Sequence, residues 1–281
     1  MEAPDPRTLE ALDLAVAPRE DPLSYPGRWP PESALLDGNR ILPLDTLVFE
    51  DRVPVLSVGS NACPAQLVHK MAEHGVECRI PMVRARVTDI GVGVSAHVSL
   101  LGYMSASPFH SPGSTRELFL TWLNEAQLAV VDTSEGVDSP TGNFHRAVLP
   151  AADFRIELES GDVLDQAWIY VNRWGVLHNG GPGPRPHPGR QRPLISELLA
   201  ASAELRELFG TTPDEFCARA RGNRGLCVRG REVFAEKRWT TVSGLEQYVR
   251  PHPRSQARLG TARAQQTGRP GTGASLSPPW I

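Results

Sequence analysis

The stretch from Val55 to Asn61 most strongly limits what this chain can fold into. Val55-Leu56-Ser57-Val58 has the β-branched, apolar character of a short buried strand, and it ends abruptly at Gly59-Ser60-Asn61. Residues 64–71 follow with apolar side chains at helical spacing, with Pro64 in the first turn and Gly75 just beyond the last. The pattern predicts a buried strand that leads through a glycine loop, with Asn61 as the N-cap, directly into a helix.

Further strand-like runs surround this unit. They lie at residues 83–93, 96–101, 103–106, 117–123, 144–149 and 165–172. Strands at such close spacing, with few helices between them, argue against a doubly wound parallel sheet. We therefore expect an α+β fold, with a small mixed or antiparallel sheet curled toward a barrel and flanking helices. One of these helices should cover residues 124–133 and end near Glu135-Gly136.

Composition divides the 281 residues into four parts. Residues 1–50 are interrupted by prolines and read as an extension that wraps along the surface of a domain. Residues 51–192 carry the strand signals, and residues 193–248 switch to the period of helices that would pack on that domain. Residues 249–281 have the composition of a disordered tail.

Charge and cysteine content exclude several classes of protein. A formal net charge of −3 gives no electrostatic footprint for nucleic acid or an acidic membrane. The four cysteines form no CxxC pair, so neither a disulfide framework nor a structural zinc site is expected. No apolar run is long enough to span a membrane, and the first residues lack the apolar core of a secretory signal. We expect a soluble, cytoplasmic protein, and the sequence leaves its oligomeric state open.

Two features carry possible chemistry. The helix that begins after Gly59-Ser60-Asn61 could hold an anionic group on its free N–H groups, although a tight turn is the alternative. Glu135 ends the next helix, where the macrodipole and desolvation by neighbouring valines would both disfavour a negative charge. Such a carboxyl suits a general acid/base near neutral pH, and a solvent-facing glutamate beside a helix-ending glycine is the alternative.

In order and spacing, these features resemble the γ-glutamylcyclotransferase-like superfamily, and in particular an uncharacterised bacterial branch. The motifs are VLSVGSN, GYMSASPFHSPG, ELFLTWLNEAQLAVVDTSEGV, NFHRAVL and AWIYV, which span about residues 53–172. The resemblance implies that Glu135 is catalytic and that the substrate is held by Val58, Gly59, Ser60, Asn61, Phe144 and Tyr170. Val58 and Phe144 stand where the family has tyrosines, so two hydroxyls are missing.

The activity implied by the resemblance is a lyase- or acyltransferase-type cyclisation. It releases 5-oxoproline and an amine from a small γ-glutamyl amide, with no metal and no organic cofactor. Two alternatives remain open. The chain could be a binding or interaction protein that keeps the pocket without activity, or it could catalyse another amide cleavage or acyl transfer in a specialised biosynthetic pathway.

Three further candidates have alternatives of their own. His97 lies late in an expected strand and could reach the same pocket to bind substrate, or it could be a structural histidine. Cys63 lies near a helix N-terminus, which favours a thiolate, but no Cys-His pair is visible in the sequence. The loop at residues 175–192 could be a lid over the substrate or an exposed connector.

Overall fold

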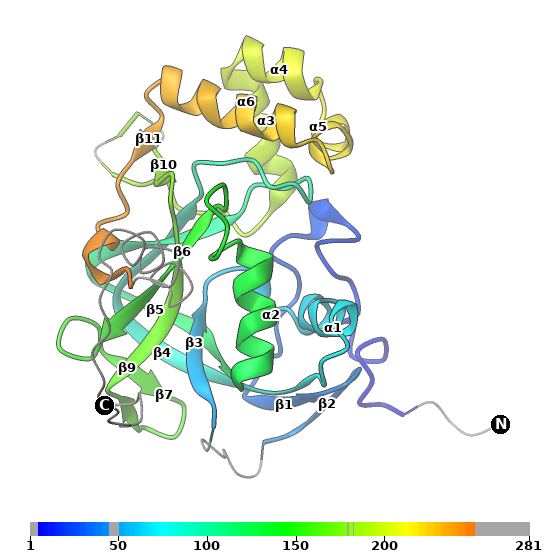
Figure 1. The fold of residues 1–281 in the computed structure, drawn as a ribbon, viewed down its shortest axis with the longest axis vertical. Coiled ribbons are helices and arrows are strands. Elements are labelled where there is room, and N and C mark those ends of the chain that lie inside the picture. Colours follow the sequence, from blue (N-terminus) through cyan, green and yellow to red (C-terminus); the bar gives the residue numbers. More distant parts are fainter. Residues whose placement is uncertain (1–4, 45–50, 179, 182, 251–281) are drawn as a thin grey trace, which may run out of the picture. The chain divides into compact units, whose positions relative to one another are not determined.

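The computed structural model describes residues 5–44, 51–178, 180–181 and 183–250 (Figure 1). These residues belong to one compact unit that ends at Arg250. The tail expected from residue 249 lies, from residue 251 onward, outside the described residues.

A mixed sheet is the centre of this unit. Its main path runs in the order β2-β1-β4-β5-β3-β9-β6, with β7 paired to β4 and β8 paired to β7. Strand β3 pairs with β5 in antiparallel and with β9 in parallel. The strands are β1 (Ala34–Asp37), β2 (Arg40–Pro43), β3 (Val53–Ser57), β4 (Arg79–Val94), β5 (Ala106–Leu123), β6 (Phe144–Pro150), β7 (Ile156–Leu158), β8 (Val163–Leu164) and β9 (Gln166–Asn172). Strands β10 (Val176–Leu177) and β11 (Thr240–Thr241) form a separate pair.

The helices fall into two groups. Helices α1 (Pro64–Glu73) and α2 (Glu125–Glu135) lie side by side, and α2 contacts β5 and β6 (Figure 1). Helices α3 (Gln191–Ala201), α4 (Ala203–Phe209), α5 (Pro213–Ala220) and α6 (Arg224–Glu236) pack together around a buried cluster of their own. Short 3₁₀ turns occur at η1 (Pro22–Ser24), η2 (Ser60–Ala62) and η3 (Glu246–Tyr248).

The α+β class and the mixed sheet agree with the sequence, but the curl toward a barrel is wrong. In the described part of the chain, β2 and β6 stand at opposite ends of the sheet path and do not pair with each other. The reason lies in the segment before β3. Strand β1 pairs with the first residues of β4, from Arg79 to Met82, and β2 then pairs with β1. The N-terminal segment therefore occupies the edge that a closed barrel would need.

Strands β4 and β5 also differ from the expected elements. The runs at 83–93 and 117–123 belong to these two long strands, whereas 96–101 forms a turn and most of 103–106 is irregular. The Ser-Pro-Gly sequence at 111–113 does not end a strand. It forms a bulge opposite Asp89, at which the pairing shifts between Thr88 and Ile90. The backbone N–H of Gly113, a residue with φ of 75°, donates to Asp89 Oδ1 at 2.6 Å.

Helix α2 ends where the sequence predicted. Asn124 accepts from the Gln127 backbone in a reciprocal capping box, and Gly136 closes the helix with φ of 72°. The start of α1 differs, because its N-cap is Cys63 rather than Asn61. Asn61 belongs to η2, which leaves its side chain available for other contacts.

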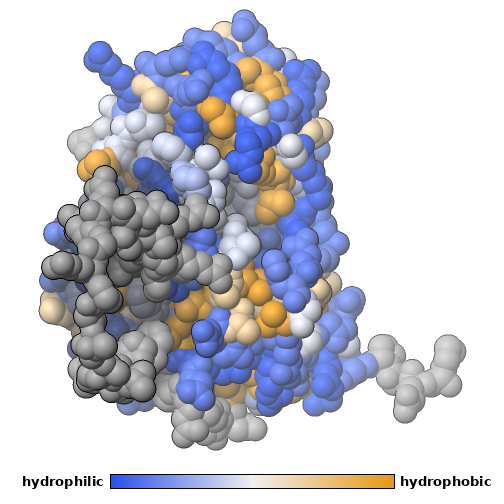
Figure 2. Space-filling model, viewed as in Figure 1, coloured by the Kyte–Doolittle hydropathy of each residue, from blue (hydrophilic) through white to orange (hydrophobic). Residues whose placement is uncertain are grey.

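The surface in Figure 2 is mainly hydrophilic. Among the described residues, the large hydrophobic side chains that are exposed are Leu12, Val16, Val163, Val228 and Val242. Within the same residues, no helix combines the length and apolar character needed to cross a membrane.

Candidate active site

A cavity of about 340 Å³ opens where β3, α1 and the end of α2 meet. This size falls in the range of small-molecule sites. The residues that the sequence suggested for the site all line it: Val58, Gly59, Ser60, Asn61, His97, Glu135, Phe144 and Tyr170. The structure adds Arg19, Tyr25, Lys70 and Tyr103, which the sequence did not suggest. The roles of these residues remain predictions.

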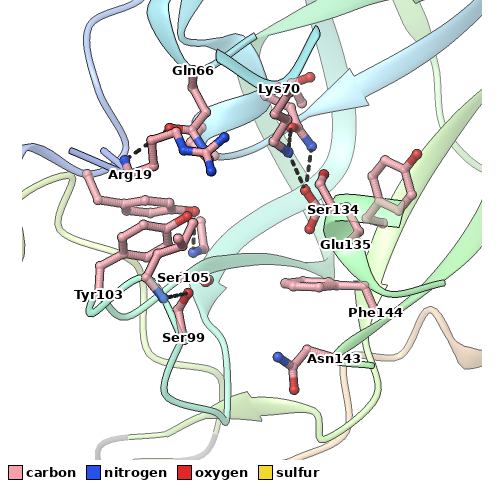
Figure 3. Close-up of a pocket in the computed structure, with 18 of the residues that line it drawn as sticks. Arg19, Gln66, Lys70, Ser99, Tyr103, Ser105, Ser134, Glu135, Asn143 and Phe144 are labelled. Carbon is pink, nitrogen blue, oxygen red and sulfur yellow. Dashed lines mark hydrogen bonds and ion pairs between the residues drawn. The ribbon is translucent and has the colours of Figure 1, made fainter. Parts of the chain in front are cut away.

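The end of α2 is joined to the Gly59–Asn61 loop through one carboxylate oxygen (Figure 3). The Asn61 amide Nδ2 donates to Glu135 Oε1 at 3.1 Å, and the Lys70 ammonium donates to the same oxygen at 3.0 Å. Lys70 also donates to Asn61 Oδ1 at 2.7 Å, which closes a triangle of hydrogen bonds. No hydrogen bond to Glu135 Oε2 is found among the described residues, so this oxygen is available to a ligand.

Lys70 and Glu135 form a buried ion pair. Their side chains are 7% and 15% exposed. The sequence suggested only influences that disfavour a charge on Glu135, namely the helix dipole and desolvation. The structure adds an ammonium and an amide N–H, which both donate to the carboxylate. Little in the sequence indicated that Lys70 belongs to the site, because a lysine among the apolar residues of a helix is usually exposed.

Gly59 permits a close approach from the N-terminal segment. A Cβ at this position would lie 2.3 Å from the Tyr25 hydroxyl oxygen, so any larger residue would force Tyr25 to move. That oxygen accepts a hydrogen bond from the Ala106 backbone N–H at 2.8 Å. The Tyr25 ring stacks on Tyr103, with centroids 4.3 Å apart. Burial raises the pKa of Tyr25 well above its usual value, and Tyr103 raises it further.

Tyr170 reaches the cavity with its hydroxyl already bonded. It donates to Asp132 Oδ1 at 2.8 Å, and Arg146 pairs with Asp132 Oδ2 at 2.9 Å. Burial, followed by the nearby Asp132, raises the pKa of Tyr170. The Tyr170 hydroxyl therefore helps to join α2 to β6 and β9, and its ring is the part left to contact a ligand.

His97 is buried and held in one tautomer. Its Nδ1 lies 2.8 Å from Asn172 Nδ2, while Asn172 Oδ1 accepts from the Trp174 backbone N–H at 2.9 Å. The Trp174 contact fixes the amide orientation, so Nδ1 must accept and the proton must sit on Nε2. Burial lowers the pKa of His97 to about 3, which keeps the ring neutral. His97 thus has the hydrogen bond expected of a structural histidine, and it also lines the cavity.

Cys63 and the 175–192 loop contribute nothing to the cavity wall in the described residues. The Cys63 thiol is fully buried and donates to the Val16 carbonyl at 3.7 Å. Burial raises its pKa to about 11, which opposes a thiolate nucleophile. In the loop, Arg185 pairs with Glu197 and Arg192 with Asp214, so these side chains face the C-terminal helices. The structure does not support the lid interpretation.

Within the described residues, no group of three or more His, Cys, Asp or Glu side chains could hold a metal ion.

Comparison with known proteins gives no sequence-level relative. No family model and no curated protein matches the chain. Several solved structures match parts of it, among them the following three. A gamma-glutamyl cyclotransferase matches with 17% identity and a TM-score of 0.33 over 43% of this chain and 66% of its own. An uncharacterized protein from Homo sapiens matches with 18% identity and a TM-score of 0.31 over 43% and 67%. A protein from Arabidopsis thaliana matches with 14% identity and a TM-score of 0.32 over 59% and 91%.

The first of these structures has the name of the superfamily that the sequence resembles. This chain spans about two thirds of that protein's length. TM-scores of 0.31 to 0.33 are too low for the overlap to carry an argument about function. The function is therefore argued from the geometry of the cavity.

Proposed function

We propose that the chain is a γ-glutamylcyclotransferase-like enzyme that releases 5-oxoproline and an amine from a small γ-glutamyl amide. The observation that carries the proposal is the contact between Glu135 and Asn61. It brings a carboxylate with one unbonded oxygen to the Gly59–Asn61 loop inside a cavity of small-molecule size. The sequence resemblance, which places the catalytic glutamate on Glu135, supports the same assignment.

The reaction needs a group that can move protons at one place. The α-amine of the substrate attacks its own γ-carbonyl carbon, so a C–N bond forms in the ring and the C–N bond to the leaving amine breaks. Two protons must pass from the α-nitrogen, an ammonium at the start, to the nitrogen that leaves. Glu135 Oε2 accepts each proton and returns it to the leaving group, and the carboxylate is unchanged at the end.

Lys70 and Asn61 keep this carboxylate in place. Because both donate to Oε1, they fix the carboxyl plane and direct Oε2 away from them. The attacking and attacked atoms belong to one molecule, so a cavity that folds the substrate into its reactive geometry supplies much of the rate. In this proposal the Gly59–Asn61 loop supplies backbone N–H groups that stabilise the oxyanion.

One observation favours the second candidate, a non-catalytic binding protein. The Lys70 ammonium already pairs with Glu135 at 3.0 Å, so the carboxylate has a partner within the protein that could give it a structural role. Val58 and Phe144 also lack the hydroxyls that the family has. A pocket with this ion pair could hold an amino-acid ligand without converting it.

Mass spectrometry of the products separates these functions. A panel of γ-glutamyl amines and dipeptides is incubated with the wild type and with Glu135→Gln. We expect 5-oxoproline from the wild type and at least a 100-fold loss in the variant, within the range that acid/base groups contribute. Glu125→Gln makes the same change at an exposed position in the first turn of α2 and should retain activity.

The other outcomes are equally specific. Release of glutamate instead of 5-oxoproline would indicate amide hydrolysis. Ligand binding without any product would favour the binding protein. Equal 5-oxoproline release by Glu135→Gln would refute the assignment of Glu135.

A further inference from the structure

Tyr25 belongs to the proline-rich N-terminal segment, yet its side chain is part of the cavity wall. The residue is only 3% exposed, so its hydroxyl is shielded from bulk solvent. The identity of the group that the hydroxyl proton binds rests on the proposed function, because the proposed function defines the substrate class.

The Tyr25 hydroxyl oxygen accepts a hydrogen bond from the Ala106 backbone N–H at 2.8 Å, and Ser60 lies beside Gly59, against which this oxygen packs. The oxygen is therefore already an acceptor, and its hydrogen is left to donate to another group. Among the described residues no acceptor for that hydrogen is found. A buried donor without a partner is costly, and a ligand oxygen would satisfy it.

Tyr25 lines the same cavity as Glu135. Tyr103, on which the Tyr25 ring stacks, lines it as well. In Figure 3, Tyr103 lies across the pocket from Lys70 and Glu135. The cavity therefore has a proton acceptor on one side and a neutral hydroxyl donor on the other.

This arrangement is complementary to an amino-acid head group. Its ammonium and its carboxylate are attached to one carbon, so a molecule with its ammonium at Glu135 Oε2 presents its carboxylate to the rest of the pocket. A neutral donor binds a carboxylate without leaving an uncompensated buried charge when the pocket is empty. Val58, next to Gly59, offers no hydroxyl, whereas Tyr25 brings one to the same loop.

Tyr25 is held rigidly before any ligand arrives. Its ring is sandwiched by contacts with Tyr103 and with the edge of His187, whose centroid is 5.7 Å away. The segment leading to it is fixed by Arg221 at the end of α5, which donates to the carbonyls of Glu20 at 3.1 Å and Arg19 at 2.5 Å. A donor that is already held in place loses little conformational entropy when a ligand binds, which favours affinity.

We propose that Tyr25 is a substrate-binding residue whose hydroxyl donates a hydrogen bond to the α-carboxylate of the γ-glutamyl substrate. The N-terminal segment is thereby part of the active site, and the C-terminal helices hold it there through Arg221.

The test compares Tyr25→Phe, which keeps the stacked ring, with Tyr248→Phe. Tyr248 donates to Asp153 at 2.8 Å, does not line the cavity and loses the same hydroxyl. A hydrogen bond to a charged group corresponds to about 10- to 100-fold in affinity. We expect KM for the γ-glutamyl substrate to rise by this factor in Tyr25→Phe with little change in kcat, and to stay within about 2-fold in Tyr248→Phe. Unchanged KM in Tyr25→Phe, with 5-oxoproline still released, overturns the inference and leaves the proposed function standing.

A second measurement does not depend on turnover or on the folding of the variant. The chain has four tyrosines, so labelling with [¹³Cζ]tyrosine gives four NMR signals. The Tyr25 signal is assigned by its absence in Tyr25→Phe or, if that variant does not fold, by elimination with the other three. We expect saturating L-glutamate to shift the Tyr25 signal and not that of Tyr248. This shift supports the inference even when no compound is cyclised, and a Tyr25 signal that L-glutamate leaves unmoved overturns it.

Discussion

The ion pair between Lys70 and Glu135 gives the sharpest test of how the site is built. The perturbation is Lys70→Met, which keeps much of the length of the side chain and removes its charge. The ammonium donates to Glu135 Oε1 at 3.0 Å and to Asn61 Oδ1 at 2.7 Å. Its loss leaves one buried carboxylate without its counter-charge and one amide oxygen without its donor.

The expected cost follows from this burial. Removing one partner of a buried ion pair costs about 3–5 kcal/mol. Glu135 is 15% exposed and keeps the Asn61 amide N–H, so we take the lower end, about 3 kcal/mol of unfolding free energy. In a Glu135→Gln background no carboxylate is left unpaired, and the same substitution should cost about 1 kcal/mol, the value of a neutral hydrogen bond. The coupling between the two positions is then about 2 kcal/mol.

Urea unfolding of the four proteins in this double-mutant cycle, at pH 7 and 25 °C, measures the coupling. Lys237→Met is the matched control, since Lys237 pairs with Glu204 at 2.9 Å but that glutamate side chain is 51% exposed. Loss of such a surface pair should cost far less than loss of the buried pair. A coupling below about 0.5 kcal/mol, or equal costs for the two lysines, would refute the view that Lys70 compensates a buried charge.

Two further predictions concern groups around the cavity. Arg221→Ala should raise KM a few-fold without lowering kcat, because Arg221 holds the segment that carries Tyr25, and this rise should disappear in a Tyr25→Phe background. Arg219→Ala, on the exposed side of α5, should leave KM unchanged. Additive effects of Arg221→Ala and Tyr25→Phe on KM would contradict a positioning role for Arg221. His97→Asn should flatten the pH dependence of stability. Because burial lowers the pKa of His97 to about 3, the unfolded chain binds its proton first, so stability falls by about 1.4 kcal/mol per pH unit from near pH 6 toward pH 3. Urea unfolding at pH 4.5 and 5.5 should show this slope in the wild type beyond that of the variant, and parallel curves would show that His97 is not held neutral.

Local signals predicted the elements that carry the proposed chemistry. The strand before Gly59 and the helix after Pro64 follow from apolar spacing and from the positions of proline and glycine. The end of α2 follows from Gly136, whose positive φ suits the residue after a helix. These signals lie within a few residues of the structure they determine, so one sequence was enough.

Contacts between distant segments could not be predicted in this way. The Tyr25 hydroxyl meets Gly59 across 34 positions of sequence, and nothing near Tyr25 marks it as part of a pocket. The Ser-Pro-Gly sequence at 111–113 has the composition of a turn, and only pairing with β4 makes it a bulge in a continuous strand. The barrel expectation failed for a related reason, since it left out the pairing of β1 with β4.

The position of the site in the sheet explains why its parts converge. Among the described strand pairs of the main sheet, β3 and β9 run parallel and the others antiparallel. Parallel neighbours have their carboxyl ends at the same edge, and ligand sites favour this edge in α/β sheets. The Gly59–Asn61 loop follows β3 at this edge, and the last residues of β9 include Tyr170 and Asn172, which bind Asp132 and His97 respectively. Asn172, which selects the tautomer of His97, and Tyr170, which anchors α2 near Glu135, thus come from one strand. A shift in the register of β9 should therefore disturb the His97 contact and the α2 anchor together.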